Sequence, residues 1–306
     1  MCAWQGRVAP QLKPAPTGSA VGVEYVGGSN EVALLPDLVD VEPTDARPSV
    51  VLIGGSGTGK THALGSMMAA GMNVMVLAVE PKLQTIARYK PKVLFIDEPI
   101  AGKAPTPAQR YDRLMRFVDA LGEGKYREHN GRPFDLIATD GLLEVGHVIY
   151  TYWKMRCPTS SRTGEQNTFA LWDNVAERAR DFFRAARDAA GLASSRYGLP
   201  PIGFVTTCGE AVVKAKTGEV RYEPLFPGNK APQILPYMFE VVLRFSCRNN
   251  EGNYEFVAHT IGTEEFYAKC PPGLFDPEVI NPNFGEMYDR LTKWFQTVAD
   301  ATEGVA

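Results

Sequence analysis

This 306-residue sequence lacks long apolar runs and paired cysteines. No stretch of about 18 apolar residues occurs, so we expect no membrane-spanning helix and no membrane partner. The segment Met1 to Pro10 has no apolar run, which argues against a signal peptide. The five cysteines are odd in number and include no C-x-x-C pair, which argues against a disulfide framework and a structural zinc site. We therefore expect a cytoplasmic protein with reduced thiols.

An excess of basic residues is also missing. The 32 lysines and arginines are balanced by 35 aspartates and glutamates, so the formal net charge is -3 at pH 7. No block of five like charges occurs, which excludes a basic or acidic tail. If the protein binds nucleic acid, it must therefore do so through a local basic patch. The four histidines show no spacing typical of a metal site.

The distribution of proline and glycine suggests where the core begins and ends. Prolines punctuate residues 1–47, which we predict to be a Pro/Gly-rich N-terminal extension with short edge strands at Val21–Val26 and Val32–Leu35. Residues 48–270 are predicted to form the core, and residues 271–306 a C-terminal tail. The tail contains an amphipathic helix, indicated by the helical spacing of Met287, Leu291, Trp294, Phe295 and Val298.

Short apolar runs alternate with helical segments through the first part of the core. A helix is predicted over residues 60–70, a second after Thr106-Pro107, and a third over residues 166–190. The third helix places Phe169, Trp172, Ala176, Ala179 and Phe183 on one side. The runs between the helices predict buried parallel strands, which indicate an α/β fold with helices on both faces of the sheet. These runs are Ser49–Ile53, Asn73–Val79, Val93–Ile96, Phe134–Thr139 and Ile202–Thr206.

The pattern changes after about residue 210. Ala211–Tyr222 alternates around Thr217-Gly218, which predicts a β-hairpin. Val241–Phe245 and Tyr254–Thr260 are expected to pair as a second hairpin. We therefore predict that the mainly parallel sheet ends in antiparallel strands on its C-terminal side.

The strongest motif follows the first apolar run and fits G-x-x-x-x-G-K-[ST]. Glycines let the backbone curl and present successive N–H groups to phosphate oxygens, and the helix that begins here adds its dipole. In such a loop the lysine reaches the β- and γ-phosphates and the hydroxyl ligates Mg²⁺. The motif predicts ATP and Mg²⁺ as ligands, and the alternative is a glycine-rich surface turn. Its residues are Gly54, Gly55, Ser56, Gly57, Thr58, Gly59, Lys60 and Thr61.

A carboxylate at the end of a neighbouring strand should complete the magnesium site. Asp97 and Asp140 both follow apolar runs, and we favour Asp140 because its position leaves room for two strands and their helices after Lys60. Glu80 ends the second strand, where a carboxylate could orient the attacking water. The alternative for Glu80 is a solvated residue at the end of a strand.

The order of these pieces resembles the RecA-like recombinase core over about residues 48–270. The resemblance rests on the phosphate loop, on Glu80 at a strand end, on the strand Asp135 to Asp140, on the strand Gly203 to Thr207 and on the terminal hairpin. More narrowly, the chain resembles phage-encoded nucleotide-binding proteins with a minimal RecA-like core, some of which act in single-strand annealing and recombination. Such a protein would work in the cytoplasm of the bacterial host.

The resemblance implies roles for individual residues. Glu80 would be the catalytic glutamate and Asp140 the aspartate on the magnesium side. Thr206 and Thr207 would lie where this family senses the γ-phosphate, although the family more often has an amide or a histidine nearby. Lys269 falls where a neighbouring subunit can supply a cation, and Arg244 is a weaker candidate. A cation supplied in this way implies a homo-oligomer, either a ring or a filament. Lys269 could also be an ordinary surface lysine.

Contacts with single-stranded DNA would be expected from the loop segments that follow the Asp140 and Thr207 strands. Both segments mix cations and aromatic residues, which suits phosphates and unpaired bases. The alternative for the first segment is a solvated helix whose aromatics belong to the core. The first segment holds Tyr150, Tyr152, Trp153, Lys154, Arg156 and Arg162, and the second Lys214, Lys216, Arg221 and Lys230.

These features bear on three functions. The first is an ATPase that binds single-stranded DNA in recombination, annealing or replication. The second is an ATP-driven switch or assembly factor for a protein complex, which the net charge of -3 favours. A small-molecule kinase is the third, but the arginine-rich lid expected of that class is not evident in the sequence.

Overall fold

The computed structural model describes residues 47–79, 83–157, 159, 164–197, 201–214, 218–228 and 230–303. These residues fall within one compact unit of the chain, Asp40–Ala306. The edge strands predicted at Val21–Val26 and Val32–Leu35 lie outside the described residues. No helix in the described ranges is long and apolar enough to cross a membrane.

One eight-stranded sheet organises the described core, in the order β12-β11-β10-β1-β7-β6-β2-β3. The six strands from β10 to β3 are parallel, and β11 and β12 are antiparallel additions at one edge. This arrangement confirms the predicted fold class. The strands are β1 (Ser49–Gly54), β2 (Val74–Ala78), β3 (Lys92–Phe95), β6 (Leu136–Asp140), β7 (Gly203–Cys208), β10 (Val241–Asn250), β11 (Asn253–His259) and β12 (Glu278–Ile280).

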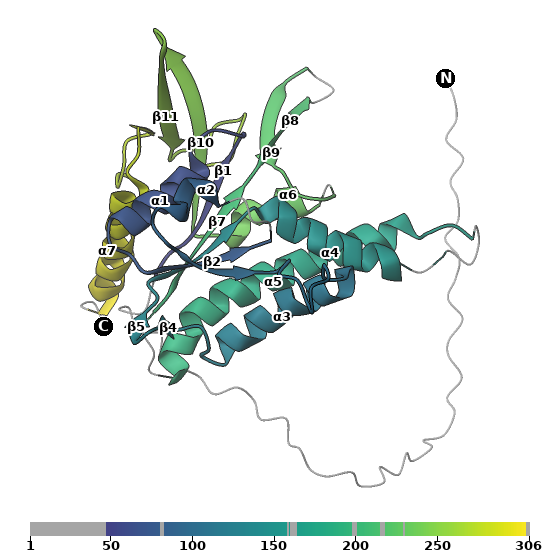
Figure 1. The fold of residues 1–306 in the computed structure, drawn as a ribbon. Helices are drawn as coiled ribbons and strands as arrows, with labels where there is room; N and C mark the ends of the chain where they lie inside the picture. Colours follow the sequence, from purple (N-terminus) through teal and green to yellow (C-terminus); the bar gives the residue numbers. More distant parts are fainter. Residues whose placement is uncertain are drawn as a thin grey trace, which may run out of the picture. The chain divides into compact units, whose positions relative to one another are not determined.

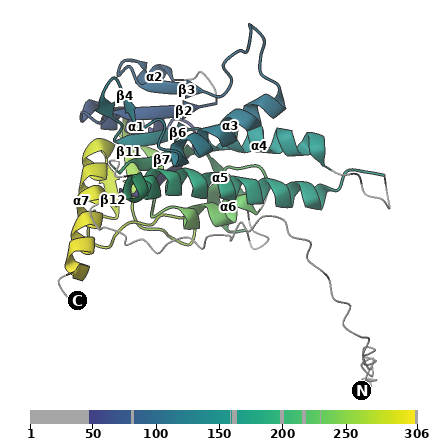
Figure 2. The ribbon, with the colours of Figure 1, turned by 90° about the horizontal axis from the view of Figure 1, so that it is seen from below.

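Helices cover both faces of the sheet (Figures 1 and 2). Side chains alternate along β1, so Val51 and Ile53 join one core and Val50 and Leu52 join the other. The first core is covered by α3 (Pro107–Gly122), α4 (Leu142–Arg156), α5 (Thr168–Tyr197), α6 (Ala231–Ile234) and a 3-10 helix, Leu235–Met238. The second is covered by α1 (Lys60–Ala69), α2 (Gln84–Ala87) and α7 (Phe284–Glu303).

Helix α3 begins as its sequence predicts. The Thr106 hydroxyl accepts a hydrogen bond from the Gln109 N–H, and the Gln109 side chain accepts one from the Thr106 N–H. This reciprocal cap satisfies two donors that the helix cannot satisfy internally. Leu114, Phe117 and Leu121, which lie on one face of this helix, are buried.

The predicted apolar face of the long helix is wrong at its beginning. Phe169 is 85% exposed and Trp172 is 36% exposed, whereas Leu171 and Val175 are buried. From Ala179 onward the prediction holds. The first turn of α5 therefore directs its largest aromatic side chains toward solvent instead of into the core.

The loop expected after Asp140 is instead a helix, α4, so that prediction is wrong and the alternative of a helix with core aromatics is right. Tyr150 and Trp153 pack against the core, and Tyr152 stacks on Tyr111 with ring centres 3.9 Å apart. The helix begins directly after Asp140 because Gly141 has a positive φ of 93° and turns the chain out of the strand.

Both predicted hairpins are present. The first is formed by β8 (Glu210–Lys214) and β9 (Val220–Pro224), which pair with each other outside the main sheet, and the second by β10 and β11. The sequence reading missed β12, which extends the sheet beyond β11. It also missed a short hairpin of β4 (Glu128–His129) and β5 (Arg132–Pro133).

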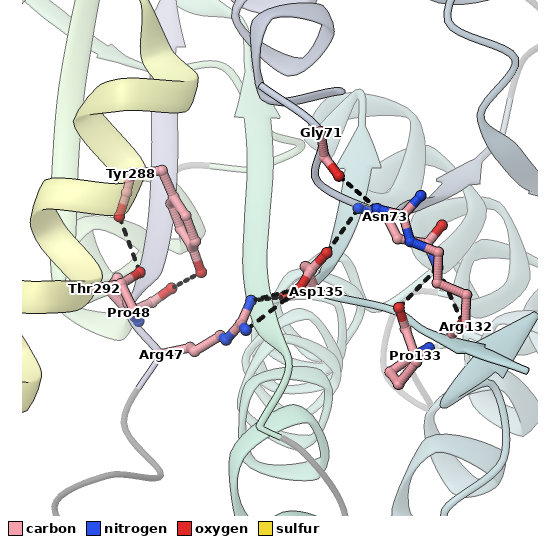
Figure 3. Close-up of polar contacts among 9 residues, drawn as sticks. All are labelled: Arg47, Pro48, Gly71, Asn73, Arg132, Pro133, Asp135, Tyr288 and Thr292. Carbon is pink, nitrogen blue, oxygen red and sulfur yellow. Dashed lines mark hydrogen bonds and ion pairs between the residues drawn. The ribbon is translucent and has the colours of Figure 1, made fainter. Parts of the chain in front are cut away.

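The amino-terminal edge of the sheet is held by a hydrogen-bond network (Figure 3). The Asp135 carboxylate accepts a hydrogen bond from the Asn73 backbone N–H at 2.8 Å and contacts the Arg47 guanidinium at 3.4 Å. The Tyr288 hydroxyl of α7 donates to the Pro48 carbonyl at 3.1 Å. These bonds connect the starts of β1, β2 and β6 to one another and to α7.

Candidate active site

The phosphate loop joins β1 to α1 at the carboxyl end of the sheet. Gly57 and Gly59 have positive φ of 77° and 92°, which ordinary residues rarely adopt. A Cβ at Gly54 would lie 2.3 Å from the Phe245 carbonyl oxygen, so only glycine fits there. Gly59 is the N-cap of α1 and supplies no side-chain cap. The first N–H groups of this helix are therefore available to an anion.

Lys60 lies across this loop. Its ammonium donates to the carbonyl oxygens of Gly54 at 2.7 Å and Gly55 at 2.6 Å. Burial lowers the pKa of Lys60, and the neighbouring charges of Asp140 and Glu210 act against that change. The Lys60 ammonium is partly desolvated and its acceptors are neutral carbonyls. It would form a stronger, charge-assisted hydrogen bond with a phosphate oxygen.

Asp140 reaches the phosphate loop although its strand, β6, is separated from β1 by β7. Its carboxylate lies 3.5 Å from the Thr61 hydroxyl and accepts a hydrogen bond from the Thr207 hydroxyl at 2.8 Å. Thr207 in turn accepts from the Gly141 N–H at 2.9 Å, which orients its hydroxyl. Burial raises the pKa of Asp140, while the Thr207 hydrogen bond and Lys60 oppose the rise.

Asp97, the other candidate, lies elsewhere. It follows β3, the strand at the far edge of the sheet, with β2, β6 and β7 between it and β1. Both of its carboxylate oxygens are engaged by Arg110, one of them at 2.7 Å from a guanidinium nitrogen. Of the two acids, the structure brings only Asp140 to Thr61.

The oxygen atoms beside the loop suit a magnesium ion. Within the described residues no group of three or more His, Cys, Asp or Glu side chains could hold a metal by itself. Mg²⁺ commonly takes one or two protein oxygens and completes its shell with water and substrate phosphates. The Thr61 hydroxyl and the Asp140 carboxylate are hard oxygen donors of the kind such an ion takes.

Three other predicted site residues have different outcomes. Glu80 lies outside the described residues. Thr206 is fully buried and its hydroxyl donates to the Thr139 carbonyl at 3.3 Å, so it faces the neighbouring strand. The Lys269 ammonium donates to the Phe239 carbonyl at 2.7 Å, at the amino end of β10. Its predicted role toward a neighbouring subunit stays a prediction.

A partly buried ion pair beside the loop was not predicted from the sequence. Glu210 follows β7 and accepts two hydrogen bonds from Arg244 of β10, at 2.7 and 3.1 Å. The Arg244 guanidinium lies 4.3 Å from the centre of the Tyr222 ring and 4.5 Å from that of Phe266. The pair connects the β8–β9 hairpin to the sheet next to Lys60. The sequence signal that could have indicated this pair is the position of Glu210 just after the apolar strand β7.

The phosphate loop between β1 and α1, with Asp140 beside Thr61, is the arrangement of a P-loop nucleotide-binding domain. A family model described as an AAA domain, AAA_24, matches residues 46–271. The chain therefore belongs to this AAA domain family. A search of curated proteins gave no match.

The solved structures that are similar to this chain include the following two. The flagellar accessory protein FlaH from Methanocaldococcus jannaschii is 12% identical, over 76% of this chain and 84% of that one, with a TM-score of 0.35. A KaiC-like protein, PH0186 from Pyrococcus horikoshii OT3, is 11% identical, over 77% of this chain and 90% of that one, with a TM-score of 0.36.

Proposed function

We propose that this protein is a Mg²⁺-dependent ATPase that binds single-stranded DNA in recombination, annealing or replication. The observation that carries the proposal is the convergence of Lys60, Thr61, Asp140 and Thr207 at the carboxyl end of the sheet. Lys60 would bind the β- and γ-phosphates, Thr61 and Asp140 would hold Mg²⁺, and Thr207 would contact the γ-phosphate.

Hydrolysis needs a group that orients water, and Glu80 is our candidate. It follows β2, which pairs with β6 so that Ala78 lies beside Asp140. The end of β2 therefore lies beside the end of β6, and we assign the role to Glu80 from its position in the sequence after β2. Lys269 of a neighbouring subunit would supply a cation, which requires a homo-oligomer, either a ring or a filament.

Support for a nucleic-acid partner comes from cations and aromatic rings at the ends of α4 and α5. Lys154 lies 5.6 Å from the centre of the Tyr150 ring, which stacks on Trp172 with centres 5.1 Å apart. Phe169 presents its ring to solvent. Exposed rings beside cations suit unpaired bases and their phosphates.

The test is ATP hydrolysis by the wild type and by Lys60→Ala, each with and without single-stranded DNA. We expect turnover that rises with DNA in the wild type and is lost in the variant. A wild type that neither binds an oligonucleotide nor changes its turnover with DNA would remove the nucleic-acid part of the proposal and leave the ATPase.

The second candidate function is an ATP-driven switch for a protein complex. The β8–β9 hairpin projects from the carboxyl end of the sheet (Figure 1) and exposes Val212 at 62% and Val213 at 38%. Exposed apolar side chains on a projecting hairpin suit a protein partner. DNA-independent turnover, together with ATP-dependent capture of a protein partner that Val212→Asp abolishes, would favour this function.

A further inference from the structure

A small pocket lies beside the phosphate loop, on the side away from Asp140. It has a volume of about 170 Å³. Gly59 and His62 of α1 form one wall, and Phe245 and Phe256 of the β10–β11 hairpin form another. Asn281 and Pro282, which follow β12, complete the lining. Pockets for whole drug-sized ligands are about 300–1,000 Å³, so this one suits a single ring system.

The geometry of the sheet says which end of a nucleotide would enter this pocket. Strand β1 has β7 on one side, with Asp140 beyond it, and β10 on the other, with Phe256 beyond it. Thr61 and Asp140 therefore place the metal and the terminal phosphates toward β7 and β6. The rest of the nucleotide must leave the loop in the opposite direction, past His62 and toward the β10–β11 hairpin.

The position of Phe256 is set by its neighbours. Its ring packs over the loop, because a Cβ at Gly59 would lie 3.2 Å from the ring. Asn281 fixes the backbone of Phe256 by two hydrogen bonds, one from the Asn281 N–H to the Phe256 carbonyl at 2.6 Å and one from the Phe256 N–H to the Asn281 side-chain oxygen at 3.1 Å.

These two bonds use the backbone N–H and the side-chain oxygen of Asn281, and they do not use the two N–H donors of its side-chain nitrogen. Among the described residues, no acceptor contacts this nitrogen. Heterocyclic bases carry ring nitrogens and carbonyl groups that accept hydrogen bonds. Phe256 and Asn281 thus line the same pocket, beside the helix terminus that would bind the phosphates.

We propose that this pocket binds the base of the nucleoside triphosphate, with Phe256 as the ring against which the base stacks. The inference rests on the proposed binding of ATP by the phosphate loop. It adds Phe256 and Asn281 as residues that position the nucleotide through its base and not through its phosphates.

The test compares two ligands that share their phosphates, Mg²⁺-ATP and Mg²⁺-tripolyphosphate. Equilibrium binding would be measured for the wild type, Phe256→Leu and Phe256→Ala. Leucine keeps the apolar contact with Gly59 but removes the ring. We expect each variant to bind ATP about tenfold more weakly, the effect of losing one base–aromatic contact, with unchanged affinity for tripolyphosphate.

Tyr254→Ala is the matched control, because Tyr254 lies on the same strand, is 72% exposed and does not line the pocket. Its affinity for both ligands should equal that of the wild type. Phe256→Trp supplies a second readout, since its fluorescence should change with ATP but not with tripolyphosphate.

Two results would overturn the inference. Unchanged affinity for ATP in Phe256→Leu would show that no base stacks there, and equal weakening of both ligands would show that the ring only supports the loop. A wild type that binds neither ligand would instead contradict the proposed function itself.

Discussion

Strand β6 has an aspartate at each end, and the two carboxylates have opposite surroundings. Asp135, just before the strand, is engaged by the Arg47 guanidinium and by the Asn73 backbone N–H (Figure 3). Asp140, the last residue of the strand, has the hydroxyls of Thr207 and Thr61 as its neighbours, and burial raises its pKa. The negative charge of Asp135 is therefore balanced within the protein by Arg47. The hydrogen-bond partners of Asp140 are hydroxyl groups, and the nearby charge of Lys60 only partly offsets its burial.

The two ends of the parallel strands, here called the amino edge and the carboxyl edge of the sheet, differ in the same way. At the amino edge, hydrogen bonds and an ion pair within the protein connect α7, β1, β2 and β6. At the carboxyl edge, the bare N-terminus of α1, a desolvated lysine and a desolvated aspartate lie close together. The charged groups of the amino edge are therefore paired within the fold, whereas those of the carboxyl edge are placed where a ligand could pair with them.

The largest effect should come from the carboxyl edge. Lys60→Ala and Asp140→Asn each remove one charge that would meet the phosphates or the metal, so we expect ATP turnover to fall by about 100-fold or more. Thermal unfolding of both variants should stay close to that of the wild type. Turnover that survives Asp140→Asn while Asp97→Asn abolishes it would reverse our choice between the two acids.

At the amino edge the large effect should be on stability. A Cβ at Gly203 would lie 1.7 Å from the Tyr288 hydroxyl, so Gly203→Ala must displace a fully buried ring. We expect a loss of about 1–3 kcal/mol in the free energy of unfolding, measured by urea denaturation. Gly122→Ala is the control, since a Cβ there meets nothing within 4 Å. Equal stability of the two variants would argue against the tight contact.

Asp135→Asn tests whether Asp135 serves the stability of the fold and, unlike Asp140, plays no part in ATP binding. It removes the charge that faces Arg47, and because both side chains are about a quarter to a third exposed we expect a loss of only about 1 kcal/mol. The affinity for ATP, measured by calorimetry, should not change. A variant with normal stability and impaired ATP binding would contradict the structural role assigned to the amino edge.

The pH dependence should follow Asp140. A carboxyl whose pKa is raised in the folded state favours folding when protonated, so its contribution to stability is present at low pH and is lost as pH rises. The metal needs the ionised form. As the pH is lowered, Mg²⁺ binding should therefore begin to weaken before the pH reaches about 3.9, the ordinary pKa of an aspartate. The carbon chemical shift of this carboxyl during an NMR titration would check the direction, with Asp140→Asn identifying the signal.

The smallest effect concerns the thiols. Cys208 lies at the carboxyl end of β7, where burial raises its pKa to about 12, whereas Cys247 on β10 is exposed. A thiol reagent at pH 8 should modify Cys247 and leave Cys208 unmodified in the folded protein, as followed by mass spectrometry. Rapid modification of Cys208 without unfolding would show that the carboxyl edge is more open than its burial implies.

Much of this architecture is local in origin and could be predicted from the sequence. The phosphate loop needs only a strand, glycines and a helix in succession, and the cap of α3 needs only Thr106, Pro107 and Gln109. Both hairpins have their turn signals beside them. The wholly apolar strands predicted a sheet covered on both faces, because such strands cannot face water.

The errors came where contacts are distant in sequence. Helix α4 looked like a loop because its aromatic residues pack against α3 and α5 on some sides and reach solvent on others. The helical spacing that groups Phe169 and Trp172 with Phe183 does not tell which part of that side of the helix meets the core. The pairing of Glu210 with Arg244 joins residues 34 positions apart.

By itself, then, the sequence determined the phosphate loop, the class of fold and two candidate acids, since each depends on short segments and on general rules of chain geometry. Only the tertiary structure decided that Asp140 faces Thr61 while Asp97 pairs with Arg110. It also placed Phe256 beside Gly59. The physical reason is the order of the strands, because β7 lies between β1 and β6 and β10 lies on the other side of β1.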